Sequence, residues 1–152
     1  MKVYRLARAA YAGLDGEGAR LYPGRWNTEG IPCIYTSSSP SLAQLEVMVN
    51  HDDWTVFERF EFRLLTIKLD ESKLIKVQPE DLPSAWRSQM VPESTQAFGP
   101  AFLHDYSKIG FAVPSVVTPQ EYNVILNPLA QNFAEYVKVI LSEKFSLDNR
   151  LL

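Results

Sequence analysis

Alternating apolar and polar residues predict several β-strands along the chain. The clearest alternation is residues 2–7, in which Val3, Arg5 and Ala7 would share one face of a strand. β-Rich segments follow, and we expect further strands at residues 31–36, 57–69, 74–77, 111–117, 122–126 and 136–145. The last segment is long enough for a helix, but its β-branched residues favour a strand.

Two of these predicted strands contain irregularities. The apolar phase of residues 57–69 shifts at Leu64-Leu65, so we expect one strand with a bulge. Pro114 interrupts residues 111–117, and proline lacks the N–H group that a central strand donates to its neighbour. We therefore expect residues 111–117 to form an edge strand or a bulged strand.

Helical signals are fewer and shorter. Ser39 fits a capping position and Pro40 fits the first helical position, which predicts a helix that ends near Asn50. Glu46 would lie beside the buried stripe of this helix, which would contain Leu42, Leu45 and Val49. Two short helices are expected within residues 80–106.

The strands outnumber the helices and do not alternate regularly with them, which predicts the α+β fold class. A glycine-rich loop is expected at residues 13–24. The chain has 152 residues, no internal repeat and no stretch that resembles a linker, so we expect one domain over residues 1–152.

Composition narrows the possible functions. The net charge of −3 and the lack of a basic run argue against nucleic-acid binding. The single cysteine, Cys33, allows no internal disulfide, and together with His51 and His104 it gives too few ligands to predict a zinc site. No apolar run predicts a signal peptide or a membrane span, so we expect a cytoplasmic protein.

The common catalytic signatures are missing, so isolated polar residues in apolar surroundings are the candidates. Arg5 would be paired or bound to an anion if buried, but it could also be an edge-strand arginine whose head reaches water. In Gly24-Arg25-Trp26, glycine permits close backbone approach, arginine offers a fork for phosphate and tryptophan offers a flat wall. An ordinary turn with a buried Trp26 is the alternative.

Three further residues leave similar choices open. Tyr35 could stack on a planar ring or belong to the core. Glu46 follows Leu45 on a largely apolar helix, where partial burial would tune a carboxylate, but it could equally lie on the polar side of that helix. Ser115 could donate a hydrogen bond to a ligand or cap a bulge.

The order of these residues is more informative than any one of them. It resembles the RES-domain family, which is named for an arginine, a glutamate and a serine, here Arg25, Glu46 and Ser115. The resemblance spans nearly the whole chain and extends to its closing segment. It rests on Tyr4-Arg5-Leu6, Gly24-Arg25-Trp26-Asn27, Tyr35-Thr36-Ser37, Leu45-Glu46, Val113-Pro114-Ser115, Glu121-Tyr122-Asn123 and Asn127-Pro128.

This resemblance implies a bacterial toxin of a type II toxin–antitoxin pair, neutralised by an Xre-type helix-turn-helix antitoxin. It implies a compact ADP-ribosyltransferase-like core of two small β-sheets with flanking helices, which holds NAD in a cleft. The family's known members degrade NAD by hydrolysis or phosphorolysis, and one branch ADP-ribosylates a metabolic enzyme. Family members often have a histidine after the pair that matches Asn127-Pro128, and this chain has none.

The implied site assigns a role to each candidate. Glu46 would stabilise positive charge on the ribose as the nicotinamide leaves NAD, because it is the only anion of the set. Arg5 and Arg25 would clamp the phosphates, and Gly24 would let the backbone approach them. Tyr35 would wall the nicotinamide, and Ser115 would hydrogen-bond the ribose or the amide. No metal is expected, and NAD is the expected substrate.

Two other functions remain open from the sequence. The chain could transfer ADP-ribose to one host protein and leave bulk NAD alone. It could also be a non-catalytic module that only binds another protein, in which case it would release no nicotinamide.

Overall fold

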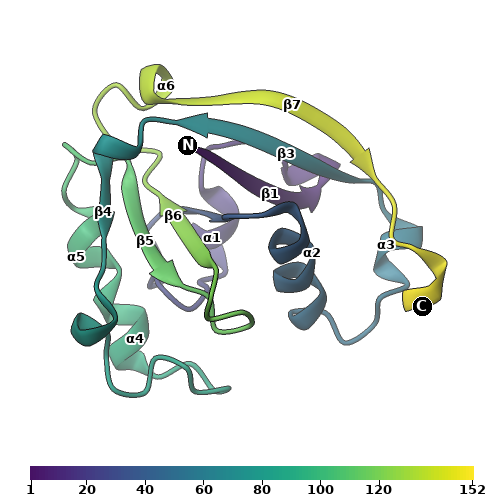
Figure 1. The fold of residues 1–152 in the computed structure, drawn as a ribbon, viewed down its shortest axis with the longest axis horizontal. Coiled ribbons are helices and arrows are strands. Elements are labelled where there is room, and N and C mark those ends of the chain that lie inside the picture. The colour runs from purple at the N-terminus through teal and green to yellow at the C-terminus, as the bar shows by residue number, and fades with distance from the viewer.

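A computed structural model describes all 152 residues and contains one seven-stranded sheet surrounded by short helices (Figure 1). The strand order is β4-β5-β6-β2-β1-β3-β7. Only β4 and β5 pair in parallel, and every other pair is antiparallel. The strands are β1 (Lys2–Arg8), β2 (Ile34–Ser37), β3 (Phe62–Leu69), β4 (Leu74–Lys76), β5 (Gly110–Pro114), β6 (Tyr122–Leu126) and β7 (Val137–Phe145).

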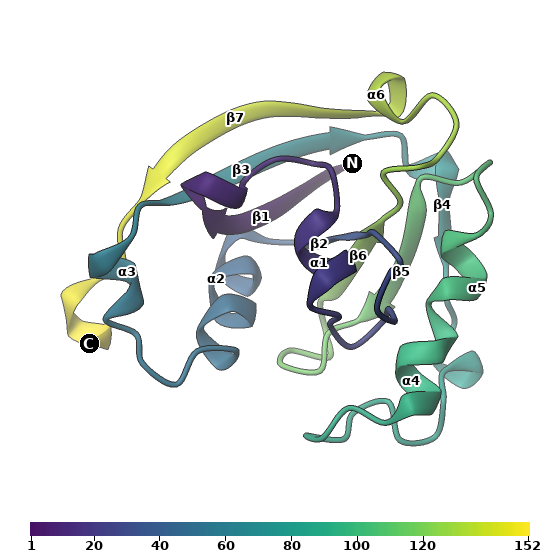
Figure 2. The ribbon, with the colours of Figure 1, turned by 180° about the vertical axis from the view of Figure 1, so that it is seen from behind.

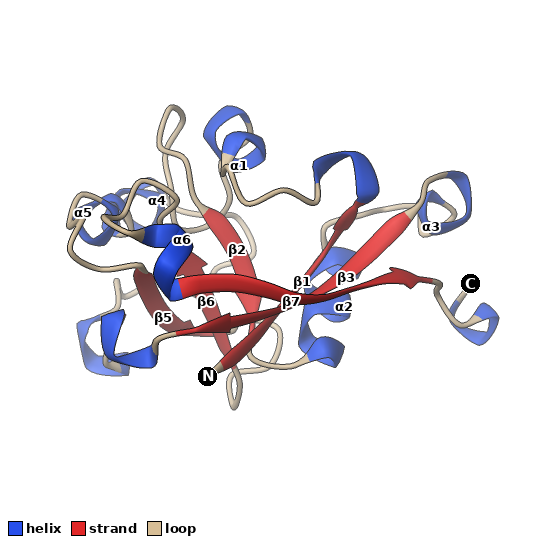
Figure 3. Ribbon diagram, turned by 90° about the horizontal axis from the view of Figure 1, so that it is seen from above, coloured by secondary structure: helices blue, strands red, loops and turns tan.

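The sheet consists of two strand groups that meet at one point. In Figure 1, β1, β3 and β7 run across the top while β4, β5 and β6 run down one side, and Figure 3 shows the same change of direction from above. The groups join between β1 and β2, where Tyr4 pairs with Ser37. The α+β fold class is thus confirmed, but one continuous, sharply bent sheet replaces the two separate sheets that we expected.

The helices lie around this bent sheet (Figure 2). The longest, α2, packs against β1 and β2, while α5 packs against β5 and α4 packs against α5. None of the helices is long and apolar enough to cross a membrane. The helices are α1 (Glu17–Leu21), α2 (Pro40–Val49), α3 (Val56–Arg59), α4 (Glu93–Phe98), α5 (Pro100–Leu103) and α6 (Phe133–Tyr136).

Helix α2 begins where the sequence predicts it. The Ser39 hydroxyl accepts a hydrogen bond from the backbone N–H of Leu42 at 3.1 Å, and Pro40 is the first helical residue. The predicted buried stripe is only partly right, because Leu45 and Val49 are 41% and 60% exposed. The helix instead buries Leu42, Ala43 and Met48, since this side faces β1 and β2.

Other boundaries differ from the prediction for local reasons. The glycine-rich loop contains α1, and α3 occupies the start of the segment predicted as a strand at residues 57–69. A bulge does occur in that segment, between Thr66 and Ile67. Strand β5 is not an edge strand, because it lies between β4 and β6. Pro114 is tolerated there because pairing with β4 ends at Ala112.

Cys33 provides a test of the packing beneath β2. It is 2% exposed in a cluster with Trp26, Leu103 and Phe111. Burial raises the pKa of its thiol to about 12, because the charged thiolate is poorly solvated there. We therefore expect no alkylation by iodoacetamide at pH 8 in the native protein and full alkylation in guanidinium chloride, measured by mass spectrometry. Rapid alkylation of the folded protein would contradict this packing.

Candidate active site

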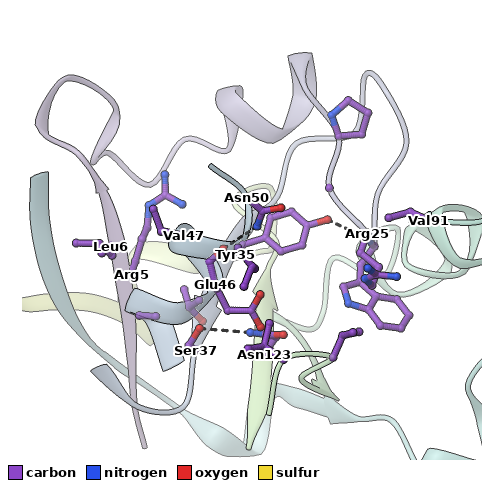
Figure 4. Close-up of a pocket in the computed structure, with 18 of the residues that line it drawn as sticks. Arg5, Leu6, Arg25, Tyr35, Ser37, Glu46, Val47, Asn50, Val91 and Asn123 are labelled. Carbon is purple, nitrogen blue, oxygen red and sulfur yellow. Dashed lines mark hydrogen bonds between the residues drawn. The ribbon is translucent and has the colours of Figure 1, made fainter. Parts of the chain in front are cut away.

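A cavity of about 800 Å³ opens between the two strand groups and α2 (Figure 4). Its walls come from β1, α2, residues 22–26 and part of the segment 87–91, and β2 and β6 form its floor. Five of the six candidate residues line this cavity: Arg5, Gly24, Arg25, Tyr35 and Glu46. The fold therefore brings together side chains that are far apart in the sequence. Arg5 and Glu46, for example, are separated by 41 positions.

Ser115, the sixth candidate, lies behind the Glu46 carboxylate. It is fully buried, and its hydroxyl donates a hydrogen bond to Glu46 Oε1 at 2.8 Å. Ser115 Oγ itself accepts hydrogen bonds from the backbone N–H groups of Val117 at 3.0 Å and Thr118 at 3.1 Å. The hydroxyl has one proton, so it has no free donor for a ligand. This geometry corrects the expected contact between Ser115 and the ribose or amide.

Ser37 and Asn123 form the floor beside Glu46. Ser37 is the last residue of β2 and is 3% exposed, and it accepts a hydrogen bond from the Asn123 side-chain amide at 3.3 Å. Figure 4 shows the Glu46 carboxylate directed toward Asn123. The sequence analysis assigned neither residue a role, because a polar residue at the end of a strand is common on any surface. Only their pairing across β2 and β6 brings them beneath the carboxylate.

Arg5 lies on an interior strand, so the alternative of an edge-strand arginine is wrong. Its Nη2 donates to the carbonyl oxygen of Tyr11 at 3.1 Å, while its Nε is buried and has no hydrogen-bond partner. No carboxylate lies within 4 Å of the guanidinium. Burial lowers the pKa of Arg5, because the charge has lost water without gaining a paired anion. Such a group is well suited to bind an anionic ligand.

Arg25 lies on the opposite side of the cavity from Arg5 (Figure 4). Its Nη1 donates to the backbone carbonyl oxygens of Trp86 at 3.0 Å and Ser88 at 2.7 Å. Burial lowers the pKa of Arg25, while the charge of Glu46 acts in the opposite direction. The two bonds use both protons of Nη1, and Nε and Nη2 remain for a ligand.

The Tyr35 hydroxyl organises the loop that carries Arg25. It donates to Asn27 Oδ1 at 2.7 Å and accepts from the backbone N–H of Trp26 at 2.9 Å. Asn27 Oδ1 also accepts from the backbone N–H of Gly24 at 2.8 Å. A Cβ at Gly24 would lie 2.7 Å from Tyr35 Cζ, so this contact requires glycine. Burial raises the pKa of Tyr35, which keeps the hydroxyl protonated for this role.

Asn27 is the residue of this network that the sequence analysis missed. It is fully buried, and its amide nitrogen also donates to the carbonyl oxygens of Ala19 and Ile31, at 2.8 and 3.0 Å. Asparagine is common in turns, so its position in the sequence gives no sign of this role. No group of three or more His, Cys, Asp or Glu residues is placed to hold a metal ion.

The site thus combines one fixed carboxylate with two guanidinium groups on opposite sides of a cavity. The carboxylate is oriented by a buried hydroxyl, neither guanidinium forms an ion pair, and Arg5 Nε has no hydrogen-bond partner. Such an arrangement suits a ligand with an anionic part and a second part that becomes cationic.

Comparisons with known proteins identify the family of the chain. The RES domain family matches residues 2–148. A protein named "Toxin Res" from Photorhabdus laumondii is 37% identical, and the match covers 100% of this chain and 97% of the relative. A protein named "Prs ADP-ribosylating toxin" from a Sphingobium species is 29% identical, and the match covers 91% of this chain and 86% of the relative.

A solved structure has the same fold. A chain of the MbcT–MbcA toxin–antitoxin complex of M. tuberculosis superposes with a TM-score of 0.73 at 22% identity. The match covers 95% of this chain and 84% of the other. Taken with the match over residues 2–148, this shows that the chain belongs to the RES-domain family of toxins.

Proposed function

We propose that the chain cleaves the bond between nicotinamide and ribose in NAD. The observation that carries this proposal is the Glu46 carboxylate, held by Ser115 inside a cavity that also presents the guanidinium groups of Arg5 and Arg25. NAD supplies both complementary parts, because its diphosphate is anionic and its nicotinamide ribose becomes cationic as the bond breaks.

Cleavage of this bond requires an anion to stabilise the ribose cation, and it does not require a general acid to protonate the leaving group. The nicotinamide ring carries a positive charge in NAD, so it leaves with the bonding electron pair as a neutral molecule. Positive charge then develops on C1′ and the ring oxygen of the ribose. The Glu46 carboxylate would stabilise that charge, and its orientation would be fixed in advance by the hydrogen bond from Ser115. We therefore assign Ser115 a positioning role.

The remaining candidates would bind and orient the dinucleotide. Arg5 has an unpartnered buried Nε, and a phosphate oxygen would satisfy it. Arg25 has free N–H groups on Nε and Nη2 after its bonds to the backbone. The ring of Tyr35 lines the cavity between the two arginines and would wall the nicotinamide.

Water or inorganic phosphate would trap the ribose cation. The oxygen of the nucleophile forms the new bond to C1′ and releases its proton to solvent, which yields ADP-ribose or its 1″-phosphate. Transfer of ADP-ribose to a protein is the second candidate, and the name of the Sphingobium relative favours it.

The biological setting is part of the proposal. The MbcT–MbcA structure pairs a toxin with its antitoxin, which supports an antitoxin partner for this chain, and we propose one of the Xre type. NAD depletion in the cytoplasm would make the unneutralised protein toxic.

One experiment tests the reaction directly. The purified chain is incubated with NAD, with and without phosphate, and the products are followed by NMR. We expect free nicotinamide together with ADP-ribose or its phosphate. Labelled NAD added with a cell lysate separates the second candidate, because transfer would put the label on a protein band. Absence of free nicotinamide under every condition would contradict both.

A further inference from the structure

Arg87, Gln89 and Val91 line one wall of the cavity, and Arg25 fixes the backbone around Arg87. The two hydrogen bonds from Arg25 Nη1 reach the carbonyl oxygens of Trp86 and Ser88, which flank Arg87 on either side. The Trp86 ring also packs against Trp26, with ring centroids 6.3 Å apart. The backbone on both sides of Arg87 is therefore held in place, although the segment has no helix or strand.

Arg87 presents an unpaired positive charge at this wall. Its side chain lines the cavity and is exposed to solvent. No carboxylate lies within 4 Å of it, and it makes no hydrogen bond within the protein. Its guanidinium carbon lies 5.8 Å from the centre of the Trp86 ring. An arginine on a free loop would normally be solvated and mobile, whereas the backbone of Arg87 is fixed beside the cavity.

We propose that Arg87 binds the adenosine 5′-phosphate half of NAD, and that Arg25 positions it for this contact. The proposal rests on the proposed function. Arg25 would thus act partly through Arg87, which explains why one of its two Nη groups is used on the backbone.

The difference in burial between the two ends of the site indicates which half of the dinucleotide reaches Arg87. The bond to be cleaved must lie next to Glu46, whose carboxylate is held by the fully buried Ser115. Arg87 lines the same cavity but is exposed to solvent, so we place the part of NAD that is farthest from the cleaved bond beside it. That part contains a phosphate and a purine, and a guanidinium binds the first by paired hydrogen bonds and the second by stacking.

The test compares Arg87→Ala with Arg150→Ala, an exposed arginine that does not line the cavity. With NAD as substrate, we expect Arg87→Ala to raise KM about tenfold or more and to leave kcat nearly unchanged, because the lost contact is remote from the reacting bond. Isothermal titration calorimetry with AMP and with nicotinamide mononucleotide shows which half of NAD Arg87 contacts. Affinity for AMP should fall about tenfold, and affinity for nicotinamide mononucleotide should stay the same.

Arg150→Ala should match the unsubstituted protein in every measurement. Equal loss of affinity for both mononucleotides, or no loss for AMP, would overturn the assignment of Arg87. If the unsubstituted protein releases no nicotinamide, the proposed function fails, and the AMP titration still decides whether Arg87 contacts an adenylate.

Discussion

Replacing Glu46 with glutamine is expected to lower the rate of nicotinamide release by about 10²–10³-fold, the usual effect of removing one preorganised electrostatic group. Glutamine has the same shape, and its carbonyl oxygen still accepts the hydrogen bond that Ser115 now donates to Glu46 at 2.8 Å. Only the negative charge disappears. The loss should therefore appear in kcat, measured from initial rates of nicotinamide release, with the melting temperature unchanged.

A matched variant distinguishes the loss of the Glu46 charge from the loss of any one surface carboxylate. Glu135 is exposed on α6 and does not line the cavity, so Glu135→Gln should retain the full rate. A folded Glu46→Gln protein with more than about a tenth of the original rate would remove Glu46 from the chemistry. Glu46 is the only carboxylate that lines the cavity, so that result would leave no other carboxylate there to stabilise the ribose cation.

Some elements of the fold follow closely from local sequence. Residues 122–126 are rich in β-branched and aromatic residues and are followed by Asn127-Pro128, and β6 has those bounds. The Ser39-Pro40 pair sets the start of α2 because a side-chain cap and a fixed proline φ act within a single turn. These features depend on neighbours in the chain, so the sequence pattern contains the necessary information.

The features that depend on distant neighbours could not be predicted in this way. Which side of α2 is buried is decided by β1 and β2, so Leu45 was assigned to the core although it is 41% exposed. The position of β5 inside the sheet depends on β4, which is too short to pair with Pro114. The single residue pair between β1 and β2 that joins the two strand groups likewise has no signal in either strand.

The same distinction between local and long-range features holds for the candidate site. The order of motifs identified which residues gather at the cavity, and five of the six line it. It did not reveal what each polar atom contacts. Ser115 donates to Glu46 rather than to a ligand, and Arg25 binds the backbone of residues 86 and 88, more than 60 positions away. The role of Arg87 depends entirely on that long-range contact.

Replacing Gly99 with alanine is expected to destabilise the fold by about 3 kcal/mol, which lowers the melting temperature by roughly 6–12 °C for a chain of this length. The backbone of Gly99 is in the ordinary helical region, so conformation is no obstacle. The obstacle is space, because a Cβ would collide with the carbonyl oxygen of Trp26 and would lie 3.2 Å from Phe111 Cζ. A backbone atom cannot rotate away, so α4 and α5 would have to separate from the loop that carries Arg25.

The same substitution at Gly18 should have the opposite sign. Gly18 lies within α1, and a Cβ there would meet nothing within 4 Å. Alanine should therefore stabilise that helix by about 0.5–1 kcal/mol. Thermal unfolding followed by circular dichroism compares the two variants. Because Trp26 adjoins Arg25, Gly99→Ala should also slow nicotinamide release below its melting temperature, whereas Gly18→Ala should not. A Gly99→Ala protein as stable as the original would mean that the α4–α5 pair does not press against the Trp26 carbonyl.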